Sequence, residues 1–437
     1  MTTLQVRSGS TARVRKAPDA GADAPQLTGS LTACRSCRGG RLHMFLPMGV
    51  QPPANAFVAP ERLHLPEPSA SLDALACLDC GLVQVPYKLP PDYFRHYVYI
   101  PSASATLHKH FSGLADTLWE RLLGAPDALA IDVGSNDGLM LSYLKARGGR
   151  TLGVEPAANL AEVARGKGLE VVNDYFTPET AQRLRRQYGA ARVVATTNTF
   201  NHIDDLHSFV RGVVDILEPG GAFVVEVPHL QACLARNEFD TIYHEHLSTF
   251  SLTSFVELFR HFDMEVFSLE LLDIHGGSMR VYGRAASGPT PSCPEVAACL
   301  AREREAGLFD RLTYDRFRES IDRNRDRTLD LLWDLKRQGK RIAAYGASAR
   351  GNTLLNYYGI GPDLLDYVVD KNPLKQGLYS PGSRLPVYPV ERLTADRPDY
   401  LLVLAWNFGA EIFEQQAAYR ALGGRFILPL PEVEVVA

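Results

Sequence analysis

The sequence predicts an α/β protein in which a small metal-binding module is followed by two doubly wound domains with parallel sheets. Two C-x-x-C pairs lie near the N-terminus, strands alternate with helices from residue 129, and the alternation begins again at residue 341. The 437 residues amount to nearly three times a usual domain of about 150 residues, so several domains are expected. A hydrophobic fraction of 46% with 22% charged residues is typical of a globular chain with a sizeable core.

Charge and hydropathy exclude two classes of partner. The formal net charge of −4 provides no basic field for binding nucleic acid. No apolar run reaches the ~18 residues of a transmembrane helix, so no membrane partner is expected. Residues 1–17 are basic and free of acid but lack the apolar stretch of a secretory signal. We interpret residues 1–30 as a disordered arm, with an organellar transit peptide as the alternative, and we expect a cytoplasmic protein.

The four N-terminal cysteines predict a structural zinc site. Cys34, Cys37, Cys77 and Cys80 form two C-x-x-C pairs, which in a long chain with reduced cysteines indicate metal ligands instead of disulfides. Four thiolates match the tetrahedral preference of Zn²⁺ and leave no position for water, so the expected role is in folding. Many prolines and little helical periodicity accompany them in residues 31–100, as in a loop-rich module stabilised by metal. The alternative is four free cysteines that do not meet in the fold.

Strand and helix patterns define a central domain, which we place at residues 101–290. Apolar residues at Leu107, Phe111, Leu114 and Leu118 predict a helix from about residue 105. Strands are predicted at 129–133, 151–155, 193–197 and 222–227, with a helix at 206–217. This spacing predicts a parallel sheet whose strands are connected by helices.

Residues 291–437 repeat this organisation on a smaller scale. Residues 294–338 are rich in Arg and Glu, and we predict that they form a solvated helical bundle that connects the two sheets. A strand at 341–345, a glycine-bearing turn at 346–351 and a helix through Tyr358 are predicted next. Further strands are predicted at 365–370, 400–405 and 426–429.

The loop after the first central strand predicts the cofactor. A dinucleotide loop has three glycines in the pattern G-x-G-x-x-G, whereas this loop reads D-x-G-x-N-x-G, with Asp132 first and Asn136 in place of a glycine. A carboxylate there disfavours a pyrophosphate and favours a cation. S-adenosylmethionine carries an ammonium, a sulfonium and a ribose, and Glu155 at the next strand end can accept the ribose hydroxyls. The expected donor-binding residues are Asp132, Gly134, Asn136, Gly138, Glu155, Asn173, Asp174 and Asn198.

Residues Tyr243-His244-Glu245-His246 form the densest cluster of titratable groups. They follow the fourth central strand, near the carboxyl edge of the sheet where ligands bind in α/β folds. They do not form the metalloprotease motif H-E-x-x-H, because adjacent residues cannot share a helix face. On an extended loop, Tyr243 and Glu245 would lie on one side and both histidines on the other. The alternative is a set of polar surface residues.

Motifs along most of the chain carry a resemblance to a known family. Besides the cysteine pairs they are residues 51–57, 132–138, 153–160, 201–203, 226–230, 243–246, 275–278 and 345–353. With these motifs the chain after residue 30 resembles the nucleotide-sugar C-methyltransferases that act on 4-keto-6-deoxyhexoses in antibiotic-sugar biosynthesis. The resemblance implies a zinc-binding module, a central Rossmann-like class I methyltransferase domain, and a C-terminal Rossmann-like domain that helps to bind the sugar nucleotide.

The resemblance also implies roles for individual residues. Catalytic-site roles are expected for Tyr97, His202, Tyr243, Glu245 and His246, with His246 as the general base. Substrate contacts are expected at His229, His275, Ser348, Arg350, Asn352 and Thr353. The implied substrate is a dTDP-linked 4-keto-deoxysugar, methylated at C3 or, as the alternative, at C5. Independently of the resemblance, we expect a monomer.

This chemistry requires a base and a group that stabilises an enolate. A keto group acidifies the neighbouring C–H bonds, and a histidine titrates near working pH, whereas an ordinary carboxylate is too weak a base. His246 is therefore preferred to Glu245, and it is preferred to His244 on the resemblance alone. Tyr243 or His202 would donate a hydrogen bond to the enolate oxygen. The phosphates would meet Ser348, Arg350 and Asn352 at a helix N-terminus.

Two other classes of protein remain open from the sequence. A nicotinamide-dependent nucleotide-sugar oxidoreductase would use the same arrangement of strand, loop and acid. A zinc-module binding protein with a catalytically inactive methyltransferase domain is the non-enzyme alternative, although the intact Asp132, Gly134 and Glu155 argue against it.

Overall fold

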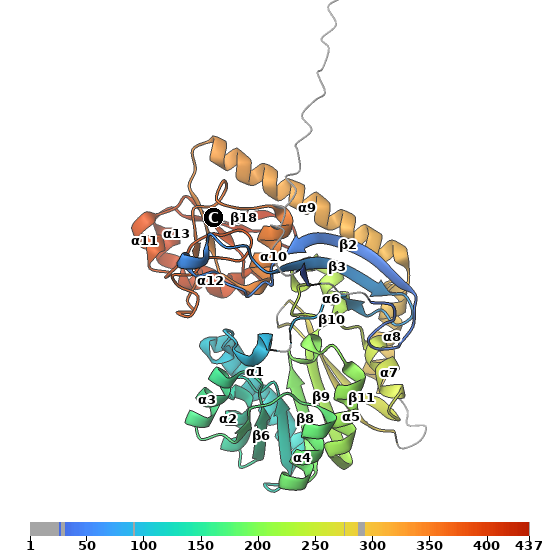
Figure 1. Ribbon diagram of the computed structural model, residues 1–437. Helices are drawn as coiled ribbons and strands as arrows, with labels where there is room; N and C mark the ends of the chain where they lie inside the picture. The colour runs from blue at the N-terminus through green and yellow to red at the C-terminus, as the bar shows by residue number, and fades with distance from the viewer. Residues whose placement is uncertain (1–25, 28–30, 91, 275, 287–292, 437) are drawn as a thin grey trace, which may run out of the picture.

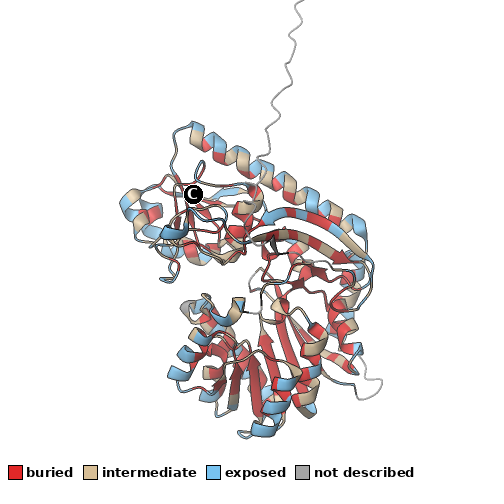
Figure 2. Ribbon diagram, in the orientation of Figure 1, coloured by how far each residue is buried: buried red, intermediate tan, exposed pale blue. Residues whose placement is uncertain are grey.

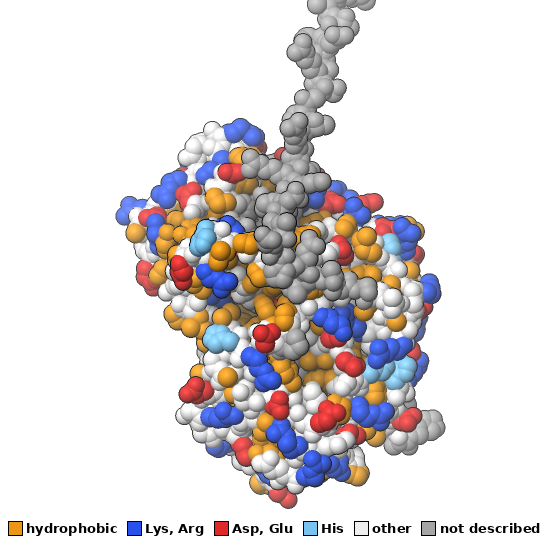
Figure 3. All heavy atoms as spheres, viewed as in Figure 1, with side chains coloured by type: hydrophobic (Ala, Val, Ile, Leu, Met, Phe, Trp, Pro, Cys, Tyr) orange, Lys and Arg blue, Asp and Glu red, His pale blue; other side chains and the backbone are white. Residues whose placement is uncertain are grey.

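The computed structural model describes the chain except for residues 1–25, 28–30, 91, 275, 287–292 and 437. The predicted disordered arm at 1–30 lies outside the described residues apart from Gln26–Leu27, which form strand β1. Three sheets organise the described residues (Figure 1), and no described helix is long and apolar enough to cross a membrane. On the face shown in Figure 3, acidic and basic side chains are intermingled.

The first sheet joins the cysteine-bearing segment to the central domain. Its strands are β1, β2 (Leu42–Gln51), β3 (Ser69–Cys77), β4 (Val83–Gln84) and β10 (Ser248–Thr249). β2 and β3 form a long antiparallel pair, and β10 pairs with β4 although it lies far along the chain. This pair was not predicted, because residues 31–100 were expected to form a loop-rich module. The buried face of β3 is formed by Leu72, Ala74 and Ala76, and its alternation is weak as a signal because alanine is only slightly apolar.

The second sheet has seven strands in the order β11-β12-β9-β8-β5-β6-β7. Its strands are β5 (Leu129–Val133), β6 (Arg150–Val154), β7 (Val171–Val172), β8 (Ala191–Thr197), β9 (Leu217–Pro228), β11 (Met264–Leu272) and β12 (Ser278–Ala285). The pairs from β7 across to β9 are parallel, and β12 and β11 add an antiparallel edge. The strand order reverses between β5 and β8, and ligands bind at such a switch point in open α/β sheets.

Helices connect the strands of this second sheet, which forms the lower lobe in Figure 1. They are α1 (Ala105–Leu118), α2 (Leu139–Ala146), α3 (Ala158–Gly166), α4 (Pro178–Tyr188), α5 (Leu206–Ile216), α6 (Leu230–Ala235) and α7 (Leu252–Arg260). The predicted helices near residue 105 and at 206–217 correspond to α1 and α5, and the four predicted strands correspond to β5, β6, β8 and β9. The buried residues of this lobe concentrate in the sheet (Figure 2).

The third sheet forms the upper lobe together with the β2–β3 pair (Figure 1). Its order is β15-β14-β13-β16-β17-β18, and only β18 is antiparallel to its neighbour among the described strands. The elements are β13 (Ile342–Tyr345), β14 (Val368–Val369), β15 (Val387–Tyr388), β16 (Tyr400–Val403), β17 (Arg425–Leu428), β18 (Glu434–Val436), α10 (Ala349–Tyr358), α11 (Arg392–Asp396), α12 (Gly409–Gln415) and α13 (Ala417–Ala421). This sheet has its own switch point between β13 and β16, so the predicted α/β class is confirmed twice.

The segment between the two parallel sheets corrects one expectation. Instead of a solvated bundle it forms α8 (Pro294–Glu305) and the single long helix α9 (Arg311–Arg337), which runs along the upper lobe (Figure 1). One face of α9 is buried, with Tyr314, Phe317 and Ile321 in the same core as Phe45 of β2. This buried face was not predicted, because its apolar residues, spaced three and four apart, are embedded among many charged ones.

Candidate active site and zinc site

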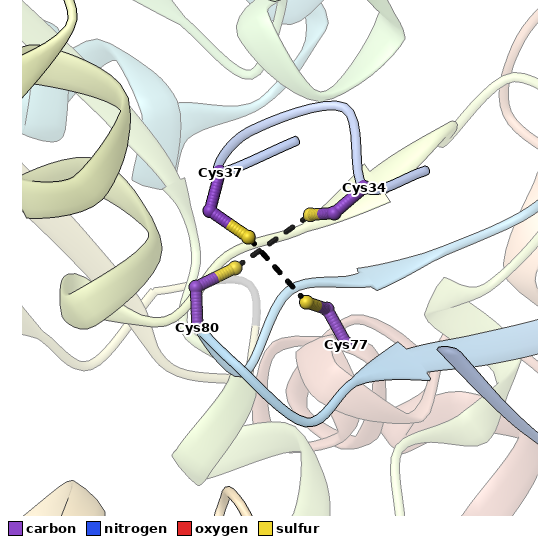
Figure 4. A group of neighbouring side chains, drawn as sticks. All are labelled: Cys34, Cys37, Cys77 and Cys80. Carbon is purple, nitrogen blue, oxygen red and sulfur yellow. Dashed lines mark hydrogen bonds between the residues drawn. The ribbon is translucent and has the colours of Figure 1, made fainter. Parts of the chain in front are cut away.

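The four predicted cysteines meet at one point (Figure 4). The Sγ atoms of Cys34 and Cys80 are 3.6 Å apart, as are those of Cys37 and Cys77, and all four sulfurs lie within 4.8 Å of one another. A tetrahedral Zn²⁺ with Zn–S bonds of about 2.3 Å separates its sulfurs by about 3.8 Å. The spacing of the thiols therefore fits a closed Zn(Cys)₄ site without a position for water.

Hydrogen bonds seat this cysteine cluster on the central domain. The Ser36 hydroxyl donates to the carbonyl of Ser254 at 2.5 Å, and the Ser251 hydroxyl donates to the carbonyl of Cys80 at 2.7 Å. The guanidinium of buried Arg35 donates to the carbonyl of Val85 at 2.8 Å. The metal would thus fix the cysteine-bearing segment against helix α7, which supports the predicted structural role.

A cavity of about 380 Å³ lies between the two switch points. Its lining comes from the carboxyl ends of β5, β6, β8 and β9 on one side, and from the loops after β13 and β16 on the other. The cysteine-bearing segment contributes Asn55, and the segment before α1 contributes Tyr97 and Tyr99. Three distant parts of the chain therefore enclose one site.

The lower side of this cavity is acidic. Asp132 Oδ1 and Ser135 Oγ are buried without a hydrogen-bond partner among the described residues, and burial, followed by the charge of Glu155, raises the pKa of Asp132 to about 8. The Glu155 carboxylate accepts the backbone N–H groups of Asn136 and Ala157, both at 2.8 Å, and still lines the cavity. An unpartnered carboxyl suits the ammonium of S-adenosylmethionine, and Glu155 suits a ribose.

The other predicted donor residues divide into two groups. Gly134, Asn136, Asp174 and Asn198 line the cavity with Asp132 and Glu155. Gly134 has φ of +77°, and a Cβ there would collide with the side chain of Thr199, so only glycine fits. Gly138 and Asn173 lie behind this surface.

These two residues support the loop instead of lining the cavity. Gly138 precedes α2 with φ of +78°, and a Cβ there would collide with Leu169. The Asn173 amide donates to the carbonyls of Glu155 and Pro156 at 2.7 and 2.9 Å. Asn173 therefore holds the turn that carries Glu155.

His246 and Tyr243 form a hydrogen-bonded pair at the centre of the cavity. The Tyr243 hydroxyl lies 2.6 Å from Nε2 of His246, and Nδ1 of His246 lies 2.8 Å from the carbonyl oxygen of Thr241. Because a carbonyl only accepts, Nδ1 carries the proton and Nε2 accepts from Tyr243. In this tautomer the Nε2 electron pair points at the Tyr243 hydroxyl, and both residues line the cavity. The His202 ring lies edge-on at a centroid distance of 4.9 Å, and burial lowers its pKa to about 4.

The alternation expected for residues 243–246 is wrong. The backbone N–H of His246 donates to the carbonyl of Tyr243 at 2.8 Å, so the segment is a turn and not an extended loop. The Tyr243 and His246 rings consequently lie on the same side, 4.0 Å apart between centroids. His244 points away, is fully buried and lies 3.3 Å from the carbonyl of Ala70. Burial lowers the pKa of His244 to about 4, so it stays neutral.

Glu245 holds the walls of the cavity together. It is fully buried; Oε1 accepts the Tyr93 hydroxyl at 2.9 Å, and Oε2 accepts the Tyr97 hydroxyl at 2.7 Å. The Asn55 amide lies within 2.9 Å of both oxygens. Burial raises the pKa of Glu245, while these donors oppose that rise. The carboxylate therefore positions Asn55 and Tyr97, which line the cavity, and does not line it itself.

The upper side of the cavity carries some of the predicted substrate residues. Ser348 and Arg350 at the start of α10 line it. Asn352 and Thr353 do not, since the Asn352 amide donates to the carbonyl of Ala54 at 2.8 Å and the Thr353 hydroxyl donates to the carbonyl of Ala349 at 3.0 Å.

The two predicted histidine contacts also lie elsewhere. His229 is buried outside the cavity lining, 3.4 Å from the carboxylate of Glu303. His275 lies outside the described residues.

Several lining residues were not predicted from the sequence. They include Asn55, Tyr99, Thr199, Lys375 and Asn407. Asn55 stands in the motif at 51–57, which carried part of the family resemblance, so that motif could have suggested it. No local pattern marks Lys375.

Comparison with protein families matches three consecutive parts of the chain. A putative zinc binding domain matches residues 34–94, a methyltransferase domain matches residues 107–269, and a C-methyltransferase C-terminal domain matches residues 273–431. These matches agree with the cysteine cluster and the acidic switch point, and they confirm zinc and S-adenosylmethionine as the predicted cofactors.

Individual methyltransferases are also similar to this chain, over very different shares of its length. The C-methyltransferase NovU of Streptomyces niveus is 36% identical over 405 residues, which cover 92% of this chain and 96% of NovU. The ubiquinone biosynthesis O-methyltransferase of Chelativorans sp. (strain BNC1) is 28% identical over 96 residues, or 22% of this chain and 38% of that one. The solved structure of an S-adenosylmethionine-dependent methyltransferase from Anabaena variabilis is 16% identical with a TM-score of 0.33, and covers 41% of this chain and 85% of that one. Because the likeness to NovU extends over nearly the whole of both chains, this chain belongs to the C-methyltransferase family and is an S-adenosylmethionine-dependent enzyme with an N-terminal zinc-binding domain.

Proposed function

We propose that this enzyme methylates a carbon next to the keto group of a dTDP-linked 4-keto-deoxysugar, at C3, with C5 as the alternative. The observation that carries the proposal is the single cavity that joins the donor switch point, the His246–Tyr243 pair and the basic edge of the third sheet. A C-methyltransferase must bring a methyl donor, a base and a carbon acid together, and this cavity has a place for each.

The base in this proposal is Nε2 of His246. The bond from Nδ1 to the Thr241 carbonyl holds the neutral tautomer and stabilises the imidazolium once a proton is taken. S-adenosylmethionine, when bound, supplies an electrophilic methyl group on its sulfonium. The Tyr243 hydroxyl, which donates to His246 in the absence of substrate, turns to the developing enolate oxygen. Burial raises the pKa of Tyr243 well above its usual value, so it remains a proton donor.

The three parts of the chain have separate tasks in this proposal. Residues 31–100 carry the structural zinc, residues 101–290 bind the donor, and residues 291–437 help to bind the sugar nucleotide. Through its hydrogen bonds, Glu245 connects the cysteine-bearing segment to the turn that carries His246, so a zinc site in that segment would stabilise this turn. Tyr97 and His202 line the cavity, and in this proposal they flank the reacting carbon.

Deuterium exchange tests the assignment of the base. Wild-type enzyme incubated with the keto sugar nucleotide in deuterium oxide, without methyl donor, should exchange the proton α to the ketone. The variant His246→Asn should lose exchange and methyl transfer by about 10²–10⁴-fold, the usual contribution of a general base. Its affinity for S-adenosylhomocysteine should be unchanged, and NMR of the wild-type product would distinguish C3 from C5.

His244→Asn is the matched control, since this neighbouring histidine faces away from the cavity. It should keep exchange near the wild-type rate. Wild-type exchange in His246→Asn would move the base elsewhere, with His202 as the next candidate.

A further inference from the structure

Two cations line the upper side of the cavity among the residues that the structure describes. They are Arg350, at the start of α10, and Lys375, in the loop after β14. The lower side carries Asp132, Glu155 and Asp174 instead. The cavity is therefore acidic where the cationic donor binds and basic at the opposite end, which suits a substrate with a negative charge.

The charge of Arg350 is already compensated. Its guanidinium lies 2.6 Å from the carboxylate of Asp240 and 3.1 Å from that of Glu238, and both acids are fully buried. Its side chain also stacks over the ring of Trp406 at 4.8 Å, and Trp406 Nε1 donates to Asp240 at 2.8 Å. Releasing Arg350 toward a phosphate would leave two buried carboxylates unpaired, which is costly. The structure therefore favours a role for Arg350 in holding the wall of the cavity.

Lys375 has the opposite surroundings. Its side chain is more than nine-tenths buried, and its Nζ donates to the carbonyl of Ala347 at 2.7 Å and lies 5.3 Å from the ring centre of Phe57. No described carboxylate forms an ion pair with this amine; burial lowers the pKa of Lys375, and the more distant charges of Asp370 and Glu245 oppose that shift. An ammonium has three N–H donors, so the contact with Ala347 leaves two for a ligand.

A buried ammonium without a carboxylate partner is unfavourable unless an anion completes its environment. The carbonyl that holds Lys375 belongs to the turn before α10, and Ser348, Ala349 and Arg350 at the start of this helix line the cavity. A lysine and a helix N-terminus at one end of a cavity form an environment suited to phosphate oxygens.

We infer that Lys375, and not Arg350, binds the diphosphate of the substrate. The inference rests on the proposed function, because it takes a nucleoside-diphosphate sugar as the ligand. Lys375 is then a substrate-binding residue that sets where the sugar lies relative to His246. The carboxylate of the methyl donor is the other anion that Lys375 could bind. Calorimetry with separate probes distinguishes this carboxylate from the diphosphate.

Calorimetry with three probes tests the inference. Lys375→Met removes the charge and keeps the length of the side chain, and the matched control is Lys371→Met, an exposed lysine of the same loop. We expect Lys375→Met to bind thymidine diphosphate about 10- to 100-fold more weakly, the value of a hydrogen bond to a charged group. Binding of thymidine and of S-adenosylhomocysteine should be unchanged, and Lys371→Met should match the wild type with all three probes.

The outcomes separate failure of the inference from failure of the proposed function. Unchanged affinity of Lys375→Met for thymidine diphosphate, or weakened affinity for S-adenosylhomocysteine, overturns the inference and leaves the proposed substrate standing. A wild-type enzyme that binds S-adenosylhomocysteine but not thymidine diphosphate overturns the proposed substrate itself. Thermal unfolding of each variant shows whether it is folded, and Lys375→Arg should recover part of the lost affinity because it restores the charge.

Discussion

The two parallel sheets present the same local arrangement to one cavity from opposite sides. In the second sheet, the acid that follows β6 is Glu155, which accepts the N–H of Asn136 in the preceding loop and the N–H of Ala157 two residues later. In the third sheet, the acid that follows β14 accepts two N–H groups in the same way. Next to each switch point, a carboxylate therefore accepts hydrogen bonds from two loop N–H groups and fixes the loop.

The third-sheet acid is Asp370, which accepts the N–H groups of Ala347 and Asn372, both at 2.7 Å. The difference lies in what reaches the cavity. Glu155 lines it, whereas Asp370 does not, and Lys375 of the same loop lines it instead. The same backbone arrangement therefore presents a carboxylate to the cavity from one sheet and an amine from the other, according to which few side chains point inward.

The largest expected effect comes from removing the zinc, because the cysteine-bearing segment helps to enclose the cavity that lies between the two switch points. Structural zinc sites contribute about 10–16 kcal/mol of apparent binding free energy in small zinc-finger peptides. Chelation, or the variant Cys77→Ser, should therefore unfold the N-terminal module, which calorimetry and elemental analysis would detect together.

Cys233→Ser is the control for the loss of a buried thiol, since Cys233 belongs to neither group of possible metal ligands among the described residues. It should retain stoichiometric zinc. Freshly purified wild-type protein without metal would contradict the assignment.

A pair of alanine variants addresses the two acids directly. Glu155→Ala should weaken S-adenosylhomocysteine binding by about 1–3 kcal/mol, since it removes the acceptor of the ribose hydroxyls. Asp370→Ala should leave that affinity unchanged and weaken thymidine diphosphate binding, because the turn that carries Ser348 loses its support. Equal effects of both variants on both ligands would show that the two switch points do not act separately.

The sequence predicted those parts of the site that lie close together along the chain. Asp132, Gly134 and Glu155 come from consecutive strand ends of one parallel sheet, so their meeting follows from the topology alone. The four cysteines were predictable for a similar reason, since a C-x-x-C spacing already implies a shared metal.

Contacts between segments far apart in the sequence could not be predicted from strand order or from cysteine spacing. Glu245 binds Asn55, 190 residues away, and Arg350 pairs with Asp240, 110 residues away. Neither pair has a periodicity or spacing that a single sequence reveals. The turn that separates His244 from His246 was missed because a local hydrogen bond, and not the side-chain pattern, decides it.

The smallest expected effect concerns pH and the acidic side of the cavity. Burial, followed by the charge of Glu155, raises the pKa of Asp132 to about 8, so most of the ligand-free enzyme carries this carboxyl protonated at pH 7. The ammonium of a bound donor favours the ionised form and lowers that pKa, so binding releases a proton. The affinity for S-adenosylhomocysteine should therefore rise between pH 6 and pH 8, by at most about tenfold per unit, and level off above pH 8.

Calorimetry in buffers with different ionisation enthalpies would count the released proton near pH 7. Asp132→Asn should bind S-adenosylhomocysteine more weakly and without this pH dependence, because an amide does not titrate in that range. Thymidine diphosphate binding serves as the internal control, since its expected contacts at Lys375 and Ser348 lie across the cavity from Asp132. A wild-type affinity for S-adenosylhomocysteine that stays constant from pH 6 to pH 8 would show that binding releases no proton from Asp132, and would contradict a contact in which the ammonium lowers a raised pKa of this carboxyl.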